Sequence, residues 1–288
     1  MIIVRDSKAA WAGLTTALAP AIFLTLSLPS PVHADAETVV PKRSVTLGGS
    51  TIVKPKYEGS NEFEVIPIPL IVPRFSDTPE DNPSVFKRFR QRVKFRGLDD
   101  IRVRVLGGER LQVGTVTGYI TDRDQSDGDL LRGWGDVEGG LVLGAYSGFR
   151  LGAIEFDAAI LEKVTGDESG FEMRFGVETT QQVTARTTVV ARVGTTFGSE
   201  EYMQTYFGVT AAQAARSRAA LPVYFADAGI KDVFVALGAT MNLSDRWLLK
   251  AGGRYGRLLG EAADSPVIET ENQLSGVLGL GYRFDLPQ

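Results

Sequence analysis

Hydrophobic and polar residues alternate with a period of two along residues 274–284, near the end of the chain. One face of this segment carries Leu274, Gly276, Leu278, Leu280, Tyr282 and Phe284. The opposite face carries Ser275, Val277, Gly279, Gly281 and Arg283. An apolar face that ends in aromatic residues, opposite a small or polar face, is typical of a transmembrane β-strand. The pattern therefore predicts the closing strand of a β-barrel in a bacterial outer membrane.

The same alternation recurs through most of the chain after Pro41 and predicts an all-β fold. Clear examples cover residues 45–53, 183–197, 233–241 and 247–255. Another strand, residues 64–75, is expected to be bulged or irregular because proline cannot donate to the sheet; it carries Pro67, Pro69 and Pro73. The chain offers roughly 11 to 13 candidate strands, and bacterial barrels have even numbers. We therefore predict a transmembrane antiparallel up-and-down β-barrel of 12 strands, with 10 strands as the alternative.

Strand length and aromatic spacing distinguish a membrane barrel from a soluble β-sandwich, which would show the same alternation. Many segments run for about 10 to 14 residues, longer than the usual strands of soluble sheets. Trp247 and Tyr255 share one face, at a vertical separation of about 20 Å, close to the ~25 Å apolar band that aromatic girdles flank. Both features favour the membrane barrel.

The N-terminus has the features of an export signal. Arg5 and Lys8 supply the positive charge, an apolar stretch follows, and Val32-His33-Ala34 forms a small-x-small cleavage site. A membrane-anchoring helix is the alternative, but the most apolar stretch, Ala17 to Leu28, has 12 residues where about 20 are needed. We expect residues 1–34 to be a cleaved signal peptide and residues 35–288 to form a single barrel domain.

The composition of residues 35–288 excludes several kinds of chemistry. Removing residues 1–34 takes away the one histidine of the chain, and the chain has no cysteine. Neither a Ser-His-Asp or Cys-His nucleophile nor a zinc site based on His or Cys can then be assembled. The 29 basic and 34 acidic residues that remain argue against nucleic acid as a partner. We therefore predict a protein that is not an enzyme and needs no cofactor or metal.

The most unusual local feature is a run of basic residues on one face of a predicted strand. This face comprises Arg88, Arg90, Arg92, Lys94 and Arg96, and beyond a corner at Asp99-Asp100 it extends to Arg102 and Arg104. Charges on the lipid face would cost about 2–4 kcal/mol each at the midplane, so this face should line the lumen or rise above the membrane. In the lumen this face would attract anions, and above the membrane it would bind lipopolysaccharide phosphates. The alternative is neutralisation by Glu155, Asp157, Glu172 and Glu178.

Other groups of polar or aromatic residues carry weaker signals. The loop with Asp122, Asp124, Asp127 and Asp129 could bind calcium, but Gly133 stands at position twelve where an EF-hand needs glutamate, which favours a solvated loop. Residues 210–227 are predicted to form an extracellular loop that includes a short helix. An aromatic girdle or the base of a loop is expected at Tyr202, Tyr206 and Phe207.

Several stretches resemble one family of outer-membrane proteins. They are Lys56-Tyr57-Glu58-Gly59-Ser60, Pro67-Ile68-Pro69, Gly133-Trp134-Gly135-Asp136-Val137-Glu138-Gly139-Gly140, Tyr202-Met203-Gln204-Thr205-Tyr206-Phe207-Gly208-Val209 and Arg257-Leu258-Leu259-Gly260-Glu261-Ala262-Ala263-Asp264-Ser265-Pro266. In these stretches the chain is similar to the MipA/OmpV family. The resemblance implies an outer-membrane barrel without enzymatic activity. Barrels of this kind normally end on an aromatic residue. This chain departs from that pattern, because Asp285-Leu286-Pro287-Gln288 follows Phe284.

The family's founding member is described as a scaffold that joins a murein hydrolase to a penicillin-binding protein at the outer membrane. Other members are treated as porin-like proteins, adhesins or antigens. The resemblance thus implies a scaffold for murein synthesis in the outer membrane of a Gram-negative bacterium. We expect this barrel to be a monomer in contact with lipid and lipopolysaccharide. The alternative is a porin-like channel that passes small anionic solutes along the basic face.

Overall fold

The computed structural model describes residues 44–74, 92–108, 110–166 and 170–285. Twelve strands form one antiparallel sheet, so the prediction of 12 strands is confirmed and the alternative of 10 is excluded. The strands are β1 (Ser44–Pro55), β2 (Phe63–Arg74), β3 (Val93–Gly97), β4 (Asp100–Gly107), β5 (Leu111–Ile120), β6 (Gly140–Leu151), β7 (Ile154–Lys163), β8 (Phe171–Thr184), β9 (Thr187–Gly198), β10 (Gly229–Asn242), β11 (Trp247–Leu258) and β12 (Asn272–Asp285).

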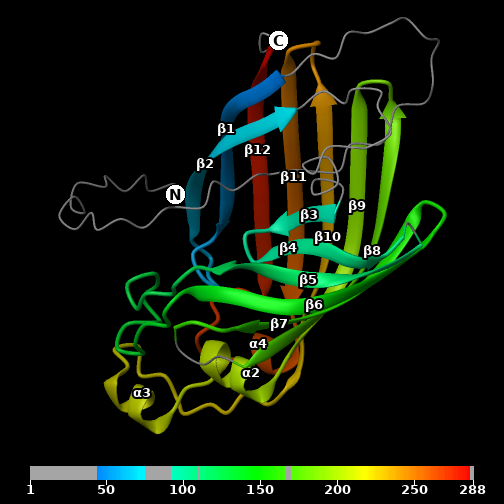
Figure 1. Ribbon diagram of the computed structural model, residues 1–288. Helices are drawn as coiled ribbons and strands as arrows, with labels where there is room; N and C mark the ends of the chain where they lie inside the picture. The colour runs from blue at the N-terminus through cyan, green and yellow to red at the C-terminus, as the bar shows by residue number, and fades with distance from the viewer. Residues whose placement is uncertain (1–43, 75–91, 109, 167–169, 286–288) are drawn as a thin grey trace, which may run out of the picture.

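Consecutive strands pair with each other, and the first strand also pairs with the last. The sheet runs β2-β1-β12-β11-β10-β9-β8-β7-β6-β5-β4-β3, so that β2 and β3 form its two edges. In Figure 1, β3 to β7 cross in front of β9 to β11 at a steep angle, as the front and back walls of a barrel with tilted strands do. The sheet is therefore curled into an up-and-down barrel, and β2 and β3 do not pair over the described residues.

Strand β2 is regular, contrary to the expectation of a bulge. It pairs with β1 from Phe63 to Arg74 without any shift of register. Along a strand, the N–H groups of alternate residues point to opposite edges, and its prolines occupy alternate positions at 67, 69 and 73. Their missing N–H groups therefore lie on the edge that faces away from β1. The expectation was wrong because proline is tolerated on an edge strand when its N–H position faces outward.

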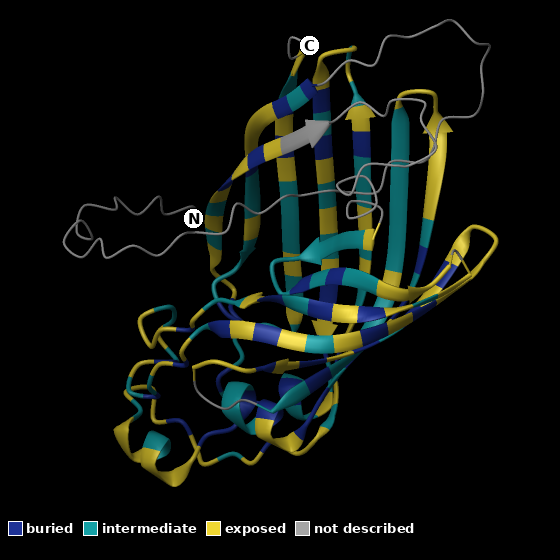
Figure 2. Ribbon diagram, viewed as in Figure 1, coloured by how far each residue is buried: buried dark blue, intermediate teal, exposed yellow. Residues whose placement is uncertain are grey.

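Side chains alternate between an apolar outer face and a polar inner face. Leu237 and Leu278 are each 60% exposed on the outer face, whereas Lys231 and Glu172 are each 3% exposed. Figure 2 shows the resulting exposed and buried bands along the strands. Soluble proteins almost never bury such charges beneath an apolar exterior. The wall is thus built for lipid outside and a polar interior, as in outer-membrane barrels.

The two ends of the barrel differ in the length of their connections. At the turn end, which also carries the end of β12, residues 152–153, 185–186 and 243–246 form short turns. The turn at 185–186 divides the segment 183–197, which the alternation had suggested as one strand. At the loop end, β3 and β4 are joined by the short turn 98–99, but other strands are joined by the longer segments 56–62, 121–139, 199–228 and 259–271.

Three short helices lie in the loop-end connections: α2 (Glu200–Phe207), α3 (Ala211–Arg216) and α4 (Gly260–Ala263). Ser199 caps α2 and Thr210 caps α3 with a capping box, which satisfies N–H groups of the first turn. The short helix expected within residues 210–227 is therefore present as α3. Among the residues that the structure describes, no helix is long and apolar enough to cross a membrane.

Candidate functional site: the charged interior and its cap

The inner face of β3 and β4 carries part of the predicted basic run, and its charges meet carboxylates on β7. Asp157, whose side chain is 1% exposed, lies 2.6 Å from Arg96, 2.8 Å from Arg102 and 2.6 Å from Arg192. Asp100 adds a second partner for Arg102 at 2.7 Å. Removing charged groups from water is costly unless they are paired and hydrogen-bonded. Asp157 therefore holds three strands together through their guanidinium groups.

Two glutamates next to this centre face each other on neighbouring strands. Glu155 of β7 is the register partner of Glu178 of β8, and like charges in that position repel. Lys94 relieves the repulsion because its Nζ lies 2.8 Å from Glu155 and 2.5 Å from Glu178. Arg96 reaches the same two carboxylates at 3.2 and 3.3 Å. The basic and acidic positions of the inner face thus form one network.

The seven residues of the predicted basic face have different surroundings. Lys94, Arg96 and Arg102 belong to the network, whereas Arg104 donates to the carbonyl oxygen of Gly108 and Arg92 is exposed. Arg88 and Arg90 lie outside the described residues. Of the four acidic neighbours named from the sequence, Glu155, Asp157 and Glu178 pair with this face. Anion or lipopolysaccharide binding by the basic face stays a prediction.

A second network joins the wall to the loop end and was not anticipated from the sequence. Lys231 of β10 lies 2.7 Å from Glu172 of β8 and 2.7 Å from Glu58, which belongs to the connection between β1 and β2. Its Nζ also donates to the Tyr202 hydroxyl at 3.0 Å. On the other side of Glu172, Arg174 lies at 2.7 Å. The one available signal was the polar position of Lys231 ahead of the alternating segment 233–241.

The loop-end connections pack together into a cap with its own apolar core. One cluster of buried side chains contains Tyr57, Leu131, Trp134, Val209, Leu221 and Val267. A neighbouring cluster contains Tyr202, Met203, Phe207, Ala226, Leu258 and Ala262. Gly133, with φ of 88°, lies so close to the carbonyl of Arg216 that a Cβ would clash with it. The cap therefore unites segments that are far apart in the sequence and covers the loop end of the barrel (Figure 1).

Arg123 lies inside the cap and was also missed by the sequence analysis. Its guanidinium carbon lies 3.9 Å from the centre of the Trp134 ring, and the residue is 6% exposed. Its Nη1 donates to the carbonyl of Tyr206 at 3.3 Å. Burial lowers the pKa of Arg123 to about 10. The attraction between the cation and the aromatic ring partly offsets the loss of water.

The weaker candidates do not assemble into a site. In the aspartate loop, Asp124 accepts from the N–H of Ser126 and Asp127 accepts from the N–H of Asp124, so these carboxylates cap turns. Over the described residues there is no group of three His, Cys, Asp or Glu side chains that could hold a metal ion. Tyr202, Tyr206 and Phe207 lie on α2 at the base of the cap, one of the two placements expected.

Comparisons with known proteins give one match that covers most of the chain. A family model described as "MltA-interacting protein MipA" matches residues 47–284. No curated protein sequence matches. Of the solved structures, an outer membrane channel from Pseudomonas putida F1 is 9% identical with a TM-score of 0.37, over 89% of this chain and all of the channel. The outer membrane protein OprD from Pseudomonas aeruginosa is 9% identical with a TM-score of 0.35, over 65% of this chain and 51% of OprD.

Proposed function

The chain belongs to the MipA family, and from that membership we propose that this outer-membrane β-barrel is a non-enzymatic scaffold for murein-synthesis machinery. The family's description names an interaction with MltA. The partners of the proposed scaffold are a murein hydrolase and a penicillin-binding protein, as the family resemblance implies.

The neutralised interior is the observation that carries the proposal. A scaffold tolerates a filled lumen, whereas an anion channel needs an open lumen with an excess of positive charge. Lys94, Arg96 and Arg102 make ion pairs with Glu155, Asp157 and Glu178. The apolar core of the cap covers the loop end above them. Both features support a scaffold over the alternative of a channel for small anionic solutes.

The chemistry of the chain supports a role without catalysis. His33 is the one histidine and lies within the proposed signal peptide, and there is no cysteine. The buried carboxylates Asp157 and Glu172 each have at least two cationic partners at 2.8 Å or less. Carboxylate oxygens that are already engaged with guanidinium and ammonium groups are not available to take a proton from a substrate.

The orientation in the membrane follows from the connections. In bacterial barrels the short turns face the periplasm and the longer loops face outward. The turn end would then face the murein layer, after export by residues 1–34 and cleavage behind Ala34. The cap would lie at the cell surface. We propose that the barrel acts as a monomer and offers its turn end to the two murein enzymes.

Two measurements on the refolded protein test this function. In a planar bilayer, we expect no stable ion-conducting openings from protein that shows the heat-dependent gel mobility of a folded barrel. Immobilised protein should retain a purified murein hydrolase and a penicillin-binding protein together. Stable anion-selective openings, lost when Lys94 and Arg96 are replaced by Gln, would instead identify a channel. Failure to retain either enzyme would reject the scaffold role.

A further inference from the structure

A cation is buried in the cap without a carboxylate beside it. Arg123 belongs to the connection between β5 and β6, where its backbone exchanges two hydrogen bonds with Val137, at 3.0 and 2.9 Å. Its side chain is enclosed, and no ion pair joins it to a carboxylate in the part of the chain that the structure describes. An arginine keeps its charge at neutral pH. The cap therefore encloses a full positive charge for which these residues supply no counter-ion.

The groups that surround Arg123 compensate this charge in part. The carbonyl of Tyr206, in the last turn of α2, accepts from Nη1, but the end of a helix carries a partial negative charge and not a full one. The Trp134 ring adds a cation–π attraction. Glu58 lies 2.7 Å from Lys231 instead. Because a buried cation is unfavourable unless it is paired, these contacts leave a place for an anion.

Two neighbouring donors in this region also lack acceptors. Neither the Nε of Arg123 nor the Nε1 of Trp134 has a hydrogen-bond partner among the described residues, and both residues are more than nine-tenths buried. Both groups donate and cannot accept. Because the guanidinium carbon lies 3.9 Å from the centre of the Trp134 ring, one oxyanion is wide enough to accept from both. Buried donors without acceptors are unfavourable, so the pair calls for a ligand that accepts hydrogen bonds.

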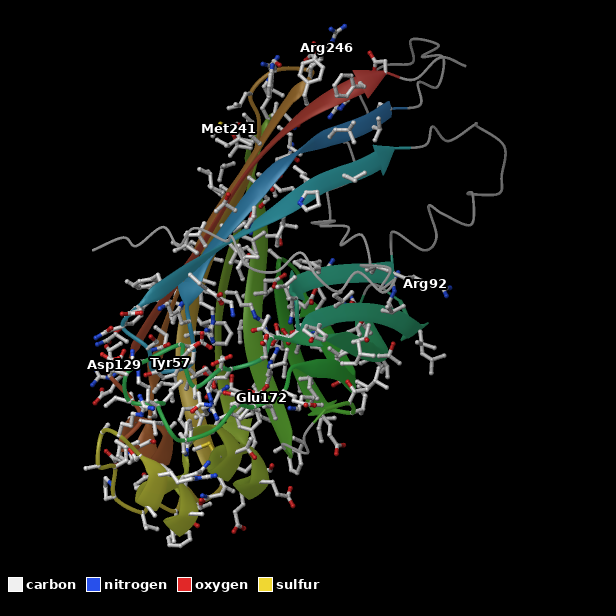
Figure 3. All side chains as sticks on the ribbon, turned by 90° about the vertical axis from the view of Figure 1, so that its left-hand side faces the viewer. Tyr57, Arg92, Asp129, Glu172, Met241 and Arg246 are labelled. Atoms are coloured by element: carbon white, nitrogen blue, oxygen red, sulfur yellow. The ribbon has the colours of Figure 1, made fainter. Side chains whose placement is uncertain are left out.

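Both donors are held in place by the packing of the cap. The carbonyl of Trp134 accepts from the side-chain amide of Gln213 on α3 at 3.1 Å, and the guanidinium is tied to the end of α2. Figure 3 shows two other cap residues, Tyr57 and Asp129, at the loop end of the molecule, far from Arg246 at the turn end. The donors are therefore preorganised for a ligand that enters from the aqueous side of the barrel.

We propose that the cap binds one small free oxyanion, a phosphate or a carboxylate, between the Nε of Arg123 and the Nε1 of Trp134. The oxygens of the ligand accept from both donors, and its charge neutralises the guanidinium. A single buried water would satisfy the two donors but would leave the positive charge without a partner. The enclosure of both residues restricts the ligand to a small ion. The site is independent of the scaffold role, which uses the turn end.

Trp134 provides a direct measurement of this binding. The chain has three tryptophans, so replacing Trp11 and Trp247 by Phe in every protein compared leaves Trp134 as the fluorophore. The full chain is refolded in phosphatidylcholine vesicles and titrated at neutral pH with sodium phosphate or sodium acetate, each replacing sodium chloride at constant ionic strength. We expect a saturable change in Trp134 emission with at least one of the two oxyanions, because the ligand would accept from the indole N–H.

Matched variants separate this site from a general effect of charge on the cap. Arg123→Met removes the buried charge and should lower the apparent affinity by about tenfold or more. Arg216→Gln with Arg218→Gln, at exposed positions in the cap, should leave the affinity unchanged. Heat-dependent gel mobility confirms that each variant is folded.

Trp134→Phe tests the second donor, because it keeps an aromatic ring over the guanidinium and removes the Nε1–H. Binding of radiolabelled phosphate or acetate in equilibrium dialysis should weaken severalfold in this variant. No saturable response of the wild-type protein to either oxyanion would overturn the proposal and assign the two donors to a buried water. A response that survives Arg123→Met would overturn it as well, because the anion would then bind elsewhere.

Discussion

The wall and the cap of this molecule follow opposite rules of burial. In the wall, apolar side chains such as Leu237 face outward, and charged groups such as Asp157 are enclosed. In the cap, Trp134 and Phe207 are enclosed while Asp129 faces the solvent. The difference reflects the two solvents around one chain, since lipid favours an apolar exterior and water favours a polar one. A single boundary, where the strands end and the loops begin, separates the two regimes.

Truncating a buried side chain in the apolar core of the cap should have the largest effect on stability and on ion conductance. Trp134→Ala removes a buried ring that contacts the Arg123 guanidinium, at a cost of about 3–5 kcal/mol to the packing of the cap. We expect the cap to loosen while the wall stays folded, so that ion conductance in planar bilayers rises. Trp247→Ala, on the outer face of the wall, is the control and should leave conductance unchanged. A Trp134→Ala barrel that conducts no better than wild type would contradict this role of the cap.

Removing the negative charge of Asp157 inside the wall should lower the stability of the barrel by a comparable or slightly smaller amount. Asp157→Asn leaves Arg96, Arg102 and Arg192 without their shared counter-ion, and breaking a buried pair costs about 3–5 kcal/mol. The urea concentration at the unfolding midpoint in lipid vesicles should fall accordingly. Asp129→Asn, in the exposed loop, is the matched control. Equal midpoints for the two variants would mean that the interior network does not stabilise the wall.

A charged residue introduced on the outer face of the wall tests whether that face needs apolar side chains. Leu237 lies near the middle of β10 and faces outward. Leu237→Arg should cost about 2–4 kcal/mol if the residue lies near the bilayer midplane. Leu237→Phe keeps the face apolar and should be close to neutral. Folding yields in vesicles would measure both, and a well-tolerated arginine would show that this part of β10 is not in contact with lipid.

Alkaline pH should lower the stability of the cap by less than the substitutions above. Burial raises the pKa of Tyr57, whose hydroxyl donates to the carbonyl of Val267 at 3.3 Å. Because the folded pKa lies above the unfolded value of about 10, the stabilisation is complete below pH 10 and is lost as the pH rises further. Tyr57→Phe should reduce this loss, as followed by urea unfolding monitored through Trp134 fluorescence. A pH profile that is identical in wild type and variant would exclude Tyr57 as the cause.

The local pattern of the sequence was sufficient to predict the strands of the wall, but not the contacts between distant side chains inside it. Alternation is a property of neighbouring residues, so it predicted the apolar face of residues 274–284 and 11 to 13 strands, from which the even strand number of bacterial barrels selected 12. The pairing of Arg102 with Asp157 spans 55 positions and depends on the register of four strands. Tyr57 and Val267 are 210 positions apart, and nothing local indicates that they meet in the cap. The regularity of β2 was missed because proline acts differently on an edge strand, and edge position is a property of the whole sheet.

The pairing of β1 with β12 has a consequence for how the chain could be reconnected. Over the described strands, the hydrogen-bonded ribbon begins at β3, continues in order through β12 and β1, and ends at β2. A circular permutant that starts just before β3 and finishes just after β2, with a linker from the end of β12 to the start of β1, would therefore break no ladder. The order of strands in the sequence and their order in the sheet differ only in the position of the β1–β2 hairpin. In the sheet this hairpin follows β12, although in the sequence it precedes β3.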